Sequence, residues 1–150
     1  MALRNIVKMG DPVLRKVCKP VDKFDQKLSQ LLDDMVETLH RAEGLGLAAP
    51  QVGILKRVCI VEYDDVLYEL VNPVLVSSSG KCVDNEGCLS VVGFRGLVER
   101  PQVIDVEYFD RNGEKKSIHA EGYFARVFLH EMDHLDGILF VDKMIKKMPD

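Results

Sequence analysis

The feature that most restricts the fold of this chain is a pair of histidines, His130 and His134, in an otherwise largely apolar stretch. That stretch predicts a helix from near residue 122 to about residue 135, which Asp136 and Gly137 end. Residues four apart lie on one face of a helix, so both imidazoles can reach one cation. Glu131 is the next residue along the helix after His130. Its carboxylate can take a proton from water that is bound to that cation. The pattern predicts a helix that carries a metal site.

The first third of the chain predicts an arm, a helix and a loop. Residues 1–20 contain two prolines and predict an irregular arm with a short turn of helix. Apolar residues recur every three or four positions over residues 24–39, which predicts an amphipathic helix that ends at Gly44. Residues 44–53 are small, apolar and interrupted by glycine and proline, so they predict a loop with close backbone approaches.

The middle of the chain changes to a period of two, which is typical of strands. Residues 57–62 and 66–76 predict two strands. Residues 104–108 alternate apolar and acidic side chains, as a half-buried antiparallel strand does. The segment 110–113 then predicts a hairpin turn, with a returning strand at 114–120. Helix, strands and helix in that order favour an α+β fold with antiparallel or mixed sheets.

Size, charge and composition limit the class of protein. A length of 150 residues fits a single domain, 1–150. The hydrophobic fraction of 47% is typical of a soluble globular protein. No apolar run reaches the ~20 residues of a membrane helix, and the first residues do not resemble a secretory signal. We therefore expect a cytoplasmic protein with no membrane partner. The net charge of −4 predicts no specific nucleic-acid partner.

A third metal ligand is needed, because a catalytic site uses three protein ligands and leaves one position open. Only sixteen residues follow His134, and none is histidine or glutamate, so the ligand is expected upstream. Cys88 is the strongest candidate, because Gly87 lets the backbone approach another element. A closed zinc site that also uses Cys82 is the alternative. Five residues separate the two cysteines, more than the usual two to four, and Glu131 would have no role.

Three segments, in this order, resemble the peptide deformylase family. They are GLGLAAPQ at 44–51, EGCLS at 86–90 and HEMDH at 130–134. The likeness extends from about Asp11 to about Asp142. It implies an α+β fold in which antiparallel or mixed sheets surround a central, metal-binding C-terminal helix, with the N-terminal helix packed outside.

The resemblance also implies a reaction. Such enzymes act in protein biosynthesis and remove the N-terminal formyl group from formyl-methionine of newly synthesised proteins, releasing formate. They hold one divalent metal ion per chain, typically iron(II), and zinc, nickel or cobalt can occupy the site in a purified sample. A Cys-His-His set also suits zinc, so the ligands alone do not identify the metal. The implied partners are nascent polypeptides that begin with N-formyl-methionine, with transient proximity to the ribosome.

Family roles carry over where the motifs match. The implied metal ligands are Cys88, His130 and His134. Glu131 would act first as general base and then as general acid. The Gln51 amide and the Leu89 backbone N–H would hold the oxyanion of the tetrahedral intermediate. The backbone groups that would pair with the substrate main chain belong to Leu45, Gly46 and Gly87.

The methionine side chain of the substrate needs an apolar slot beside the metal. Val127 lies one helical turn before Glu131, and Tyr123 lies a further turn back. With Leu45, these side chains could line that slot. The alternative is that they pack in the core.

Residues 85–90, which contain Cys88 and which we call the cysteine segment, predict a turn. A charged group is also expected to orient this segment. Glu86 lies in it, before Cys88, and Arg95 and Arg100 follow it. We expect Glu86 to pair with one of these arginines and hold the turn in place. The alternative is that all three are surface charges.

Two other functions share part of this pattern. A zinc endopeptidase would need the histidine motif but neither Cys88 nor Gln51. A metal-stabilised peptide-binding module without activity would tolerate replacement of Glu131. Val92 and Leu129 also depart from the residues that the family often has beside these motifs, proline and glutamine respectively.

Overall fold

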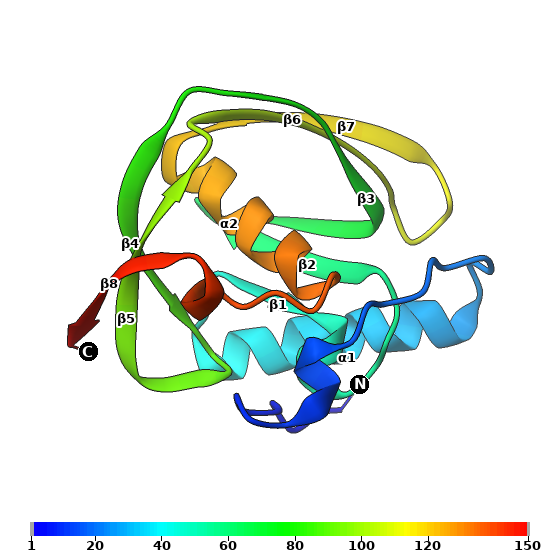
Figure 1. Cartoon of the computed structure of the whole chain (residues 1–150). Coiled ribbons are helices and arrows are strands. Elements are labelled where there is room, and N and C mark those ends of the chain that lie inside the picture. Colours follow the sequence, from blue (N-terminus) through cyan, green and yellow to red (C-terminus); the bar gives the residue numbers. More distant parts are fainter. Residues whose placement is uncertain (1, 150) are drawn as a thin grey trace.

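The computed structural model describes residues 2–149 and has an α+β fold (Figure 1). The helices are α1 (Gln26–Ala42) and α2 (Gly122–His134). The strands are β1 (Gly46–Ala48), β2 (Val58–Tyr63), β3 (Val66–Ser79), β4 (Cys82–Cys88), β5 (Val91–Arg100), β6 (Val103–Phe109), β7 (Lys115–Glu121) and β8 (Met144–Pro149). Three short 3-10 turns are η1 (Pro12–Arg15), η2 (Ala49–Val52) and η3 (Phe140–Asp142).

Two sheets and the helix between them form the framework. One sheet has the strand order β1-β2-β3-β6-β7, and the other has the order β4-β5-β8. Every ladder between these strands is antiparallel. Helix α2 lies centrally, with strands of both sheets around it (Figure 1). The predicted central C-terminal helix is therefore confirmed, and mixed sheets are not needed.

Strand β2 explains why the two helices occupy opposite faces of the larger sheet. Val58 and Ile60 belong to the apolar cluster that contains the buried face of α1. Cys59 and Val61 belong to the cluster that contains α2. Side chains alternate between the faces of a strand, and all four are fully buried. Each such side chain contributes about 1.5–3 kcal/mol when fully buried, so β2 binds both layers together, with α1 outside as expected.

The predicted helices and strands agree with the structure, apart from their ends. Strands β2, β3, β6 and β7 lie where period two predicted them, and η1 is the short helical turn in the arm. Helix α1 ends at Ala42 rather than at Gly44, because Glu43 takes the left-handed conformation, with φ of 57°, and caps the helix. A residue other than glycine ends this helix, which the sequence rule does not anticipate.

Two predicted irregular segments contain strands. Residues 44–53 were expected to be a loop, but Gly46–Ala48 pairs with β2 before η2 begins. The cysteine segment was expected to be a turn, but Cys88 is the last residue of β4 and the turn itself is Leu89 and Ser90. Strand β1 has only three residues, and the seven residues of β4 do not alternate between apolar and polar side chains.

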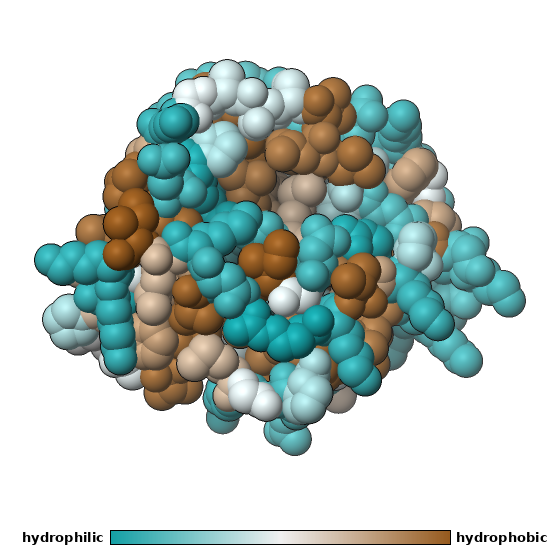
Figure 2. Space-filling model, viewed as in Figure 1, coloured by the Kyte–Doolittle hydropathy of each residue, from teal (hydrophilic) through white to brown (hydrophobic). Residues whose placement is uncertain are grey.

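Neither helix in residues 2–149 is long and apolar enough to cross a membrane. On the face in Figure 2, hydrophilic residues predominate, and apolar residues form separate patches rather than one stripe.

The N-terminal arm closes over the C-terminal end of α2. The Cys18 N–H donates to the Leu135 carbonyl at 2.8 Å. Gly137, just beyond the helix, has φ of +76°, and a Cβ built on it would lie 2.5 Å from the Arg15 carbonyl oxygen. The arm can therefore cross here only because residue 137 has no side chain.

We expect Gly137→Ala to lower the free energy of unfolding by about 2–4 kcal/mol, the sum of left-handed strain and a backbone clash. Gly53→Ala is the matched control, because Gly53 has φ of +82° but open space around the Cβ position. It should cost only about 1–2 kcal/mol from strain. Urea unfolding at equal metal loading measures both. Equal losses at the two positions would show that the arm yields to the added methyl group.

Candidate metal centre

Helix α2 carries three buried ionisable side chains near its C-terminal end. His130, Glu131 and His134 are all buried. The imidazole centroids of the two histidines lie 5.1 Å apart, as expected for neighbours one helical turn apart. The helix thus sets the spacing of these groups, and the surrounding sheets exclude most of the water around them.

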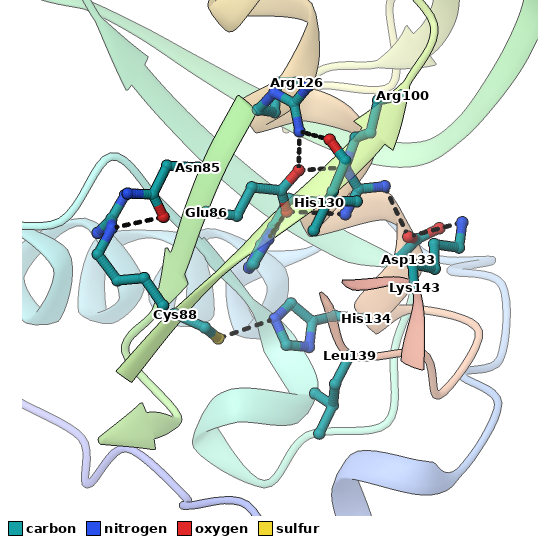
Figure 3. A network of polar contacts seen from close by, with 12 residues as sticks. Asn85, Glu86, Cys88, Arg100, Arg126, His130, Asp133, His134, Leu139 and Lys143 are labelled. Carbon is teal, nitrogen blue, oxygen red and sulfur yellow. Dashed lines mark hydrogen bonds and ion pairs between the residues drawn. The ribbon is translucent and has the colours of Figure 1, made fainter. Parts of the chain in front are cut away.

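Cys88 joins the two histidines from the end of β4. The possible ligand atoms of Cys88, His130 and His134 all lie within 4.8 Å of one another. Cys88 Sγ is 3.4 Å from His134 Nε2 (Figure 3). Two ligands on a tetrahedral metal, at the usual sulfur and nitrogen distances, lie about 3.5 Å apart. The three residues therefore fit a divalent cation, although they do not identify which one.

Cys82 does not take part in this cluster. It lies at the opposite end of β4 from Cys88 and pairs with Arg100, whereas Cys88 pairs with Val91. Six residues of extended strand span roughly 20 Å. The alternative of a closed site with two cysteines and two histidines is therefore wrong.

Glu86 is the centre of a buried network beside this cluster (Figure 3). Its Oε1 lies 2.8 Å from His130 Nδ1 and 2.9 Å from Arg100 Nη2. Its Oε2 accepts a hydrogen bond of 2.7 Å from Arg126. Arg100 also donates to Asp133, which Lys143 contacts at 3.0 Å. The side chains of Glu86, Arg100 and Arg126 are only 3% exposed.

This network sets the protonation of the buried groups. Burial raises the pKa of Glu86, but hydrogen bonds from Arg100 and His130 outweigh it and hold that pKa well below its ordinary value. Glu86 therefore stays a carboxylate and keeps a proton on His130 Nδ1. The remaining nitrogen of His130, Nε2, is then the one that can face a cation.

The surroundings shift the pKa values of the two histidines in opposite directions. Burial lowers the pKa of His130, but hydrogen bonds with Cys88 and Glu86 raise it to about 10. At such a pKa both ring nitrogens of His130 carry a proton. A cation that binds at Nε2 displaces the proton on that nitrogen. Burial, followed by the charge of His130, lowers the pKa of His134 well below its ordinary value. A neutral imidazole of this kind is the form that binds metals.

Arg95 and Arg100 have different positions, although both follow the cysteine segment. Arg100 pairs with Glu86, as one of the two was expected to do. Arg95 instead bonds the Asn85 side chain at 3.3 Å and lies over Gly87, where a Cβ would be 2.5 Å from its guanidinium. Sequence reasoning does not single out Arg126. The available signal is a charged residue one turn before His130, among apolar neighbours.

Glu131 lies against the backbone of β1. Its Oε2 is 2.6 Å from the place where a Cβ on Gly46 would be, so only glycine leaves room for the carboxylate. Its Oε1 is buried and has no hydrogen-bond partner within the described residues. Burial raises the pKa of Glu131 to about 7, and the positive charge of a nearby cation acts in the opposite direction.

Gln51 is held by both of its amide atoms. Its Oε1 accepts from the Ala48 N–H at 2.9 Å, and its Nε2 donates to Ser90 Oγ at 3.0 Å. The same Nε2 lies 3.5 Å from Cys88 Sγ. Gln51 and Ser90 are each only 1% exposed. The amide is therefore fixed beside the sulfur, and Ser90 has a contact that its place in the motif does not reveal.

A cavity of about 320 Å³ connects these groups. Its lining contains Cys88, His130, Glu131 and Gln51. The residues predicted to bind substrate also line it, namely Leu45, Gly46, Gly87, Tyr123 and Val127, together with Leu89. His40 and His119 lie elsewhere and are exposed, and each pairs with carboxylates.

The chain is similar in sequence and in fold to known deformylases. The family model described as polypeptide deformylase matches residues 3–149. A peptide deformylase of Caldicellulosiruptor bescii is 54% identical over 146 residues, which are 97% of this chain and 88% of the relative. The solved peptide deformylase of Thermotoga maritima has a TM-score of 0.93 at 41% identity, covering 95% of this chain and 97% of that one. That of Thermus thermophilus has a TM-score of 0.90 at 44% identity, covering 93% and 84%.

We expect Glu86→Gln to weaken metal binding about 10- to 100-fold, because an amide holds His130 and the two arginines less well than a carboxylate. Competition with a chelator measures the dissociation constant. Arg95→Ala is the matched control, since Arg95 lies on the same strand as Arg100 but does not bond Glu86. It should keep its metal affinity. An unchanged affinity in Glu86→Gln would contradict the orienting role.

Proposed function

Because the chain belongs to the peptide deformylase family, we propose how its residues remove the N-terminal formyl group from nascent peptides. The observation that carries the proposal is the convergence of Cys88, His130 and His134, beside a cavity that Cys88, His130, Glu131 and Gln51 line. Residues 1–150 act here as a single catalytic domain, in the cytoplasm, on chains that begin with N-formyl-methionine and are close to the ribosome.

The proposed metal ligands are the Cys88 thiolate and the Nε2 atoms of His130 and His134. A divalent cation bound there supplies positive charge that activates water and polarises the formyl carbonyl. We propose iron(II) as the metal in the cell, with zinc, nickel or cobalt in some purified samples. A soft thiolate with two imidazoles is compatible with each of these ions.

Glu131 is the proposed carrier of the proton. A formamide is opened by attack of water, and the amine that leaves is poor until it is protonated. Glu131 takes the proton of the attacking water and then delivers it to the amine nitrogen. Its buried Oε1, which has no partner within the described residues, is available for both transfers. A pKa that burial raises toward neutrality favours a group that must both accept and release a proton.

Gln51 and Leu89 are the proposed donors to the oxyanion. The Gln51 Nε2 carries two hydrogens, and Ser90 Oγ accepts one of them. The second is donated to Cys88 Sγ at 3.5 Å, beside the cavity that Gln51 lines. The Leu89 N–H belongs to the turn after β4 and has no hydrogen-bond partner within residues 2–149. Two fixed donors of this kind stabilise the charge that develops on the formyl oxygen.

The substrate main chain is proposed to lie between two sheet edges. Strand β1 is the edge of the larger sheet, and β4 is an edge of the smaller one. Leu45 and Gly46 on one side, and Gly87 on the other, line the cavity. An extended peptide can add to such edges through main-chain hydrogen bonds.

The first side chain of the substrate has an apolar slot in the same cavity. Val127 and Tyr123 line it one and two helical turns before Glu131, and Leu45 lines it as well. The Tyr123 hydroxyl is occupied by a hydrogen bond of 2.9 Å to the Asn85 carbonyl. The ring of Tyr123 is therefore held in place, and we propose that it presents apolar surface to the methionine side chain of the substrate.

Glu131→Gln should lower kcat about 10²- to 10⁴-fold, because a neutral amide cannot carry the proton. The metal content should stay unchanged. Formate release from a formyl-methionyl peptide, with anaerobically prepared protein, measures kcat. Glu121→Gln is the control, because Glu121 precedes the same helix but is exposed. If the wild-type chain binds metal and releases no formate, the proposal is wrong. Cleavage of internal peptide bonds would indicate an endopeptidase instead.

The identity of the metal has its own test. Iron(II)-loaded protein should release formate and lose activity in air within minutes to hours, with oxidation of the Cys88 sulfur or of the iron. Zinc-loaded protein should keep under the same exposure whatever activity it has, because zinc has no redox chemistry. Mass spectrometry of the Cys88 peptide follows the sulfur. Air-stable activity in the iron form would contradict the proposed choice of metal.

A further inference from the structure

The N-terminal arm joins the two segments that carry the proposed oxyanion donors. The Val7 N–H donates to the Gln51 carbonyl at 2.7 Å, and the Met9 N–H donates to the Ser90 carbonyl at 2.7 Å. Between them, Lys8 Nζ lies 3.2 Å from the Leu89 carbonyl. Three successive arm residues thus contact the residues that hold, or adjoin, both donors.

The two donors come from different sheets. Gln51 follows β1, at the edge of the five-stranded sheet, whereas Leu89 follows β4, in the three-stranded sheet. No ladder among the strands of residues 2–149 joins these sheets. The distance between the donors is therefore not set by strand pairing. The direct hydrogen bonds between the two segments run from Gln51 Nε2 to Ser90 Oγ, at 3.0 Å, and to Cys88 Sγ, at 3.5 Å.

The arm has the geometry to fix that distance. In an extended chain, N–H groups two residues apart point the same way and lie about 6.6–6.8 Å apart. Val7 and Met9 are two residues apart, and each donates to one of the two segments. The arm is itself anchored before these residues, where the Arg4 N–H bonds Thr38 Oγ1 at 3.0 Å, and after them, where Leu14 is buried.

We propose that Val7 and Met9 are positioning residues for deformylation, whose backbone N–H groups hold Gln51 and the Leu89 turn at the spacing that the oxyanion requires. This inference rests on the oxyanion role proposed above for Gln51 and Leu89. Donors act on an oxyanion at about 2.7–3.1 Å, and a shift of about 1 Å can cost on the order of 100-fold in rate. Residues 7–9 of the arm, which we call the strap, connect segments of the two sheets. The strap therefore affects kcat without touching the substrate.

Comparing proline with alanine at one position separates the effect of losing the backbone N–H from the effect of losing the side chain. Each of residues 7, 8 and 9 is replaced by alanine and, separately, by proline. The Lys8 N–H donates no hydrogen bond within the described residues, so position 8 is the matched control. Met9 tolerates proline well, because residues 8 to 11 form a turn with Gly10 at φ of +108°, and the position before such a glycine accepts proline.

We expect an alternating pattern in kcat for formate release. Proline should lower kcat about tenfold relative to alanine at positions 7 and 9. At position 8 the two variants should agree within twofold. KM and the bound metal per chain should change less than twofold throughout, because the slot and the ligands are intact. An equal loss at all three positions, or no loss at 7 and 9, would overturn the proposal.

A double-mutant cycle links the strap to the oxyanion. In a Gln51→Ala background, Val7→Pro should lower kcat less than threefold relative to Val7→Ala, because the donor that it positions is gone. The full tenfold loss in that background would show a general effect on the fold. If Gln51→Ala alone keeps wild-type kcat, the assigned role of Gln51 fails instead. Should a proline variant not fold, a backbone ester at the same position removes the same N–H and keeps the side chain.

Discussion

The hydrogen bond between Glu86 and His130 is the interaction on which the rest of the site depends. It determines which imidazole nitrogen carries a proton and which faces Cys88. A buried carboxylate is costly, by several kcal/mol, unless it is fully paired. Arg100 and Arg126 supply that pairing. Arg126 also donates to the Val98 and Cys82 carbonyls, so one guanidinium joins α2 to both β4 and β5.

This network explains how a small chain places groups from distant segments around one point. Helix α2 provides two imidazoles and a carboxylate at a spacing fixed by its own geometry. The end of β4 adds the sulfur of Cys88, and η2 adds an amide. Apolar side chains of α2 pack in the cluster that contains strands of the larger sheet. The ion pair between Arg126 on α2 and Glu86 on β4 reaches the smaller sheet. The candidate metal site thus lies between the two sheets, and the contacts that cross between them decide its geometry.

Local patterns were enough to predict most of the elements, because periodicity reports on burial within a single segment. The row of His130, Glu131 and His134, the hairpin after β6 and the buried strand β2 all carry strong local signals. Strand β8 does not, since Lys146 and Lys147 interrupt any alternation. Cys88 could be chosen as a ligand mainly by elimination and by its motif. The site roles of Glu131, Gln51 and Leu89 stay predictions.

Contacts between distant segments lay beyond the reach of these patterns. In the sequence alone, Arg126 resembles an ordinary helical residue. Its hydrogen bond to Glu86, forty residues earlier, is seen only in the folded chain. The same holds for the arm, because nothing in Val7 or Met9 as side chains indicates that their backbone groups reach Gln51 and Ser90. Such contacts depend on which strands form which sheet, and that choice is not a local property.

X-ray absorption of the metal-loaded protein tests the central claim most directly, because it counts the ligands around the metal. For zinc, a site of Cys88, His130 and His134 predicts one sulfur at about 2.3 Å, two imidazole nitrogens at about 2.0–2.1 Å, and at least one further light atom at the open position. A shell with two sulfur atoms, or with none, would contradict the ligand set and with it the arrangement derived from Glu86.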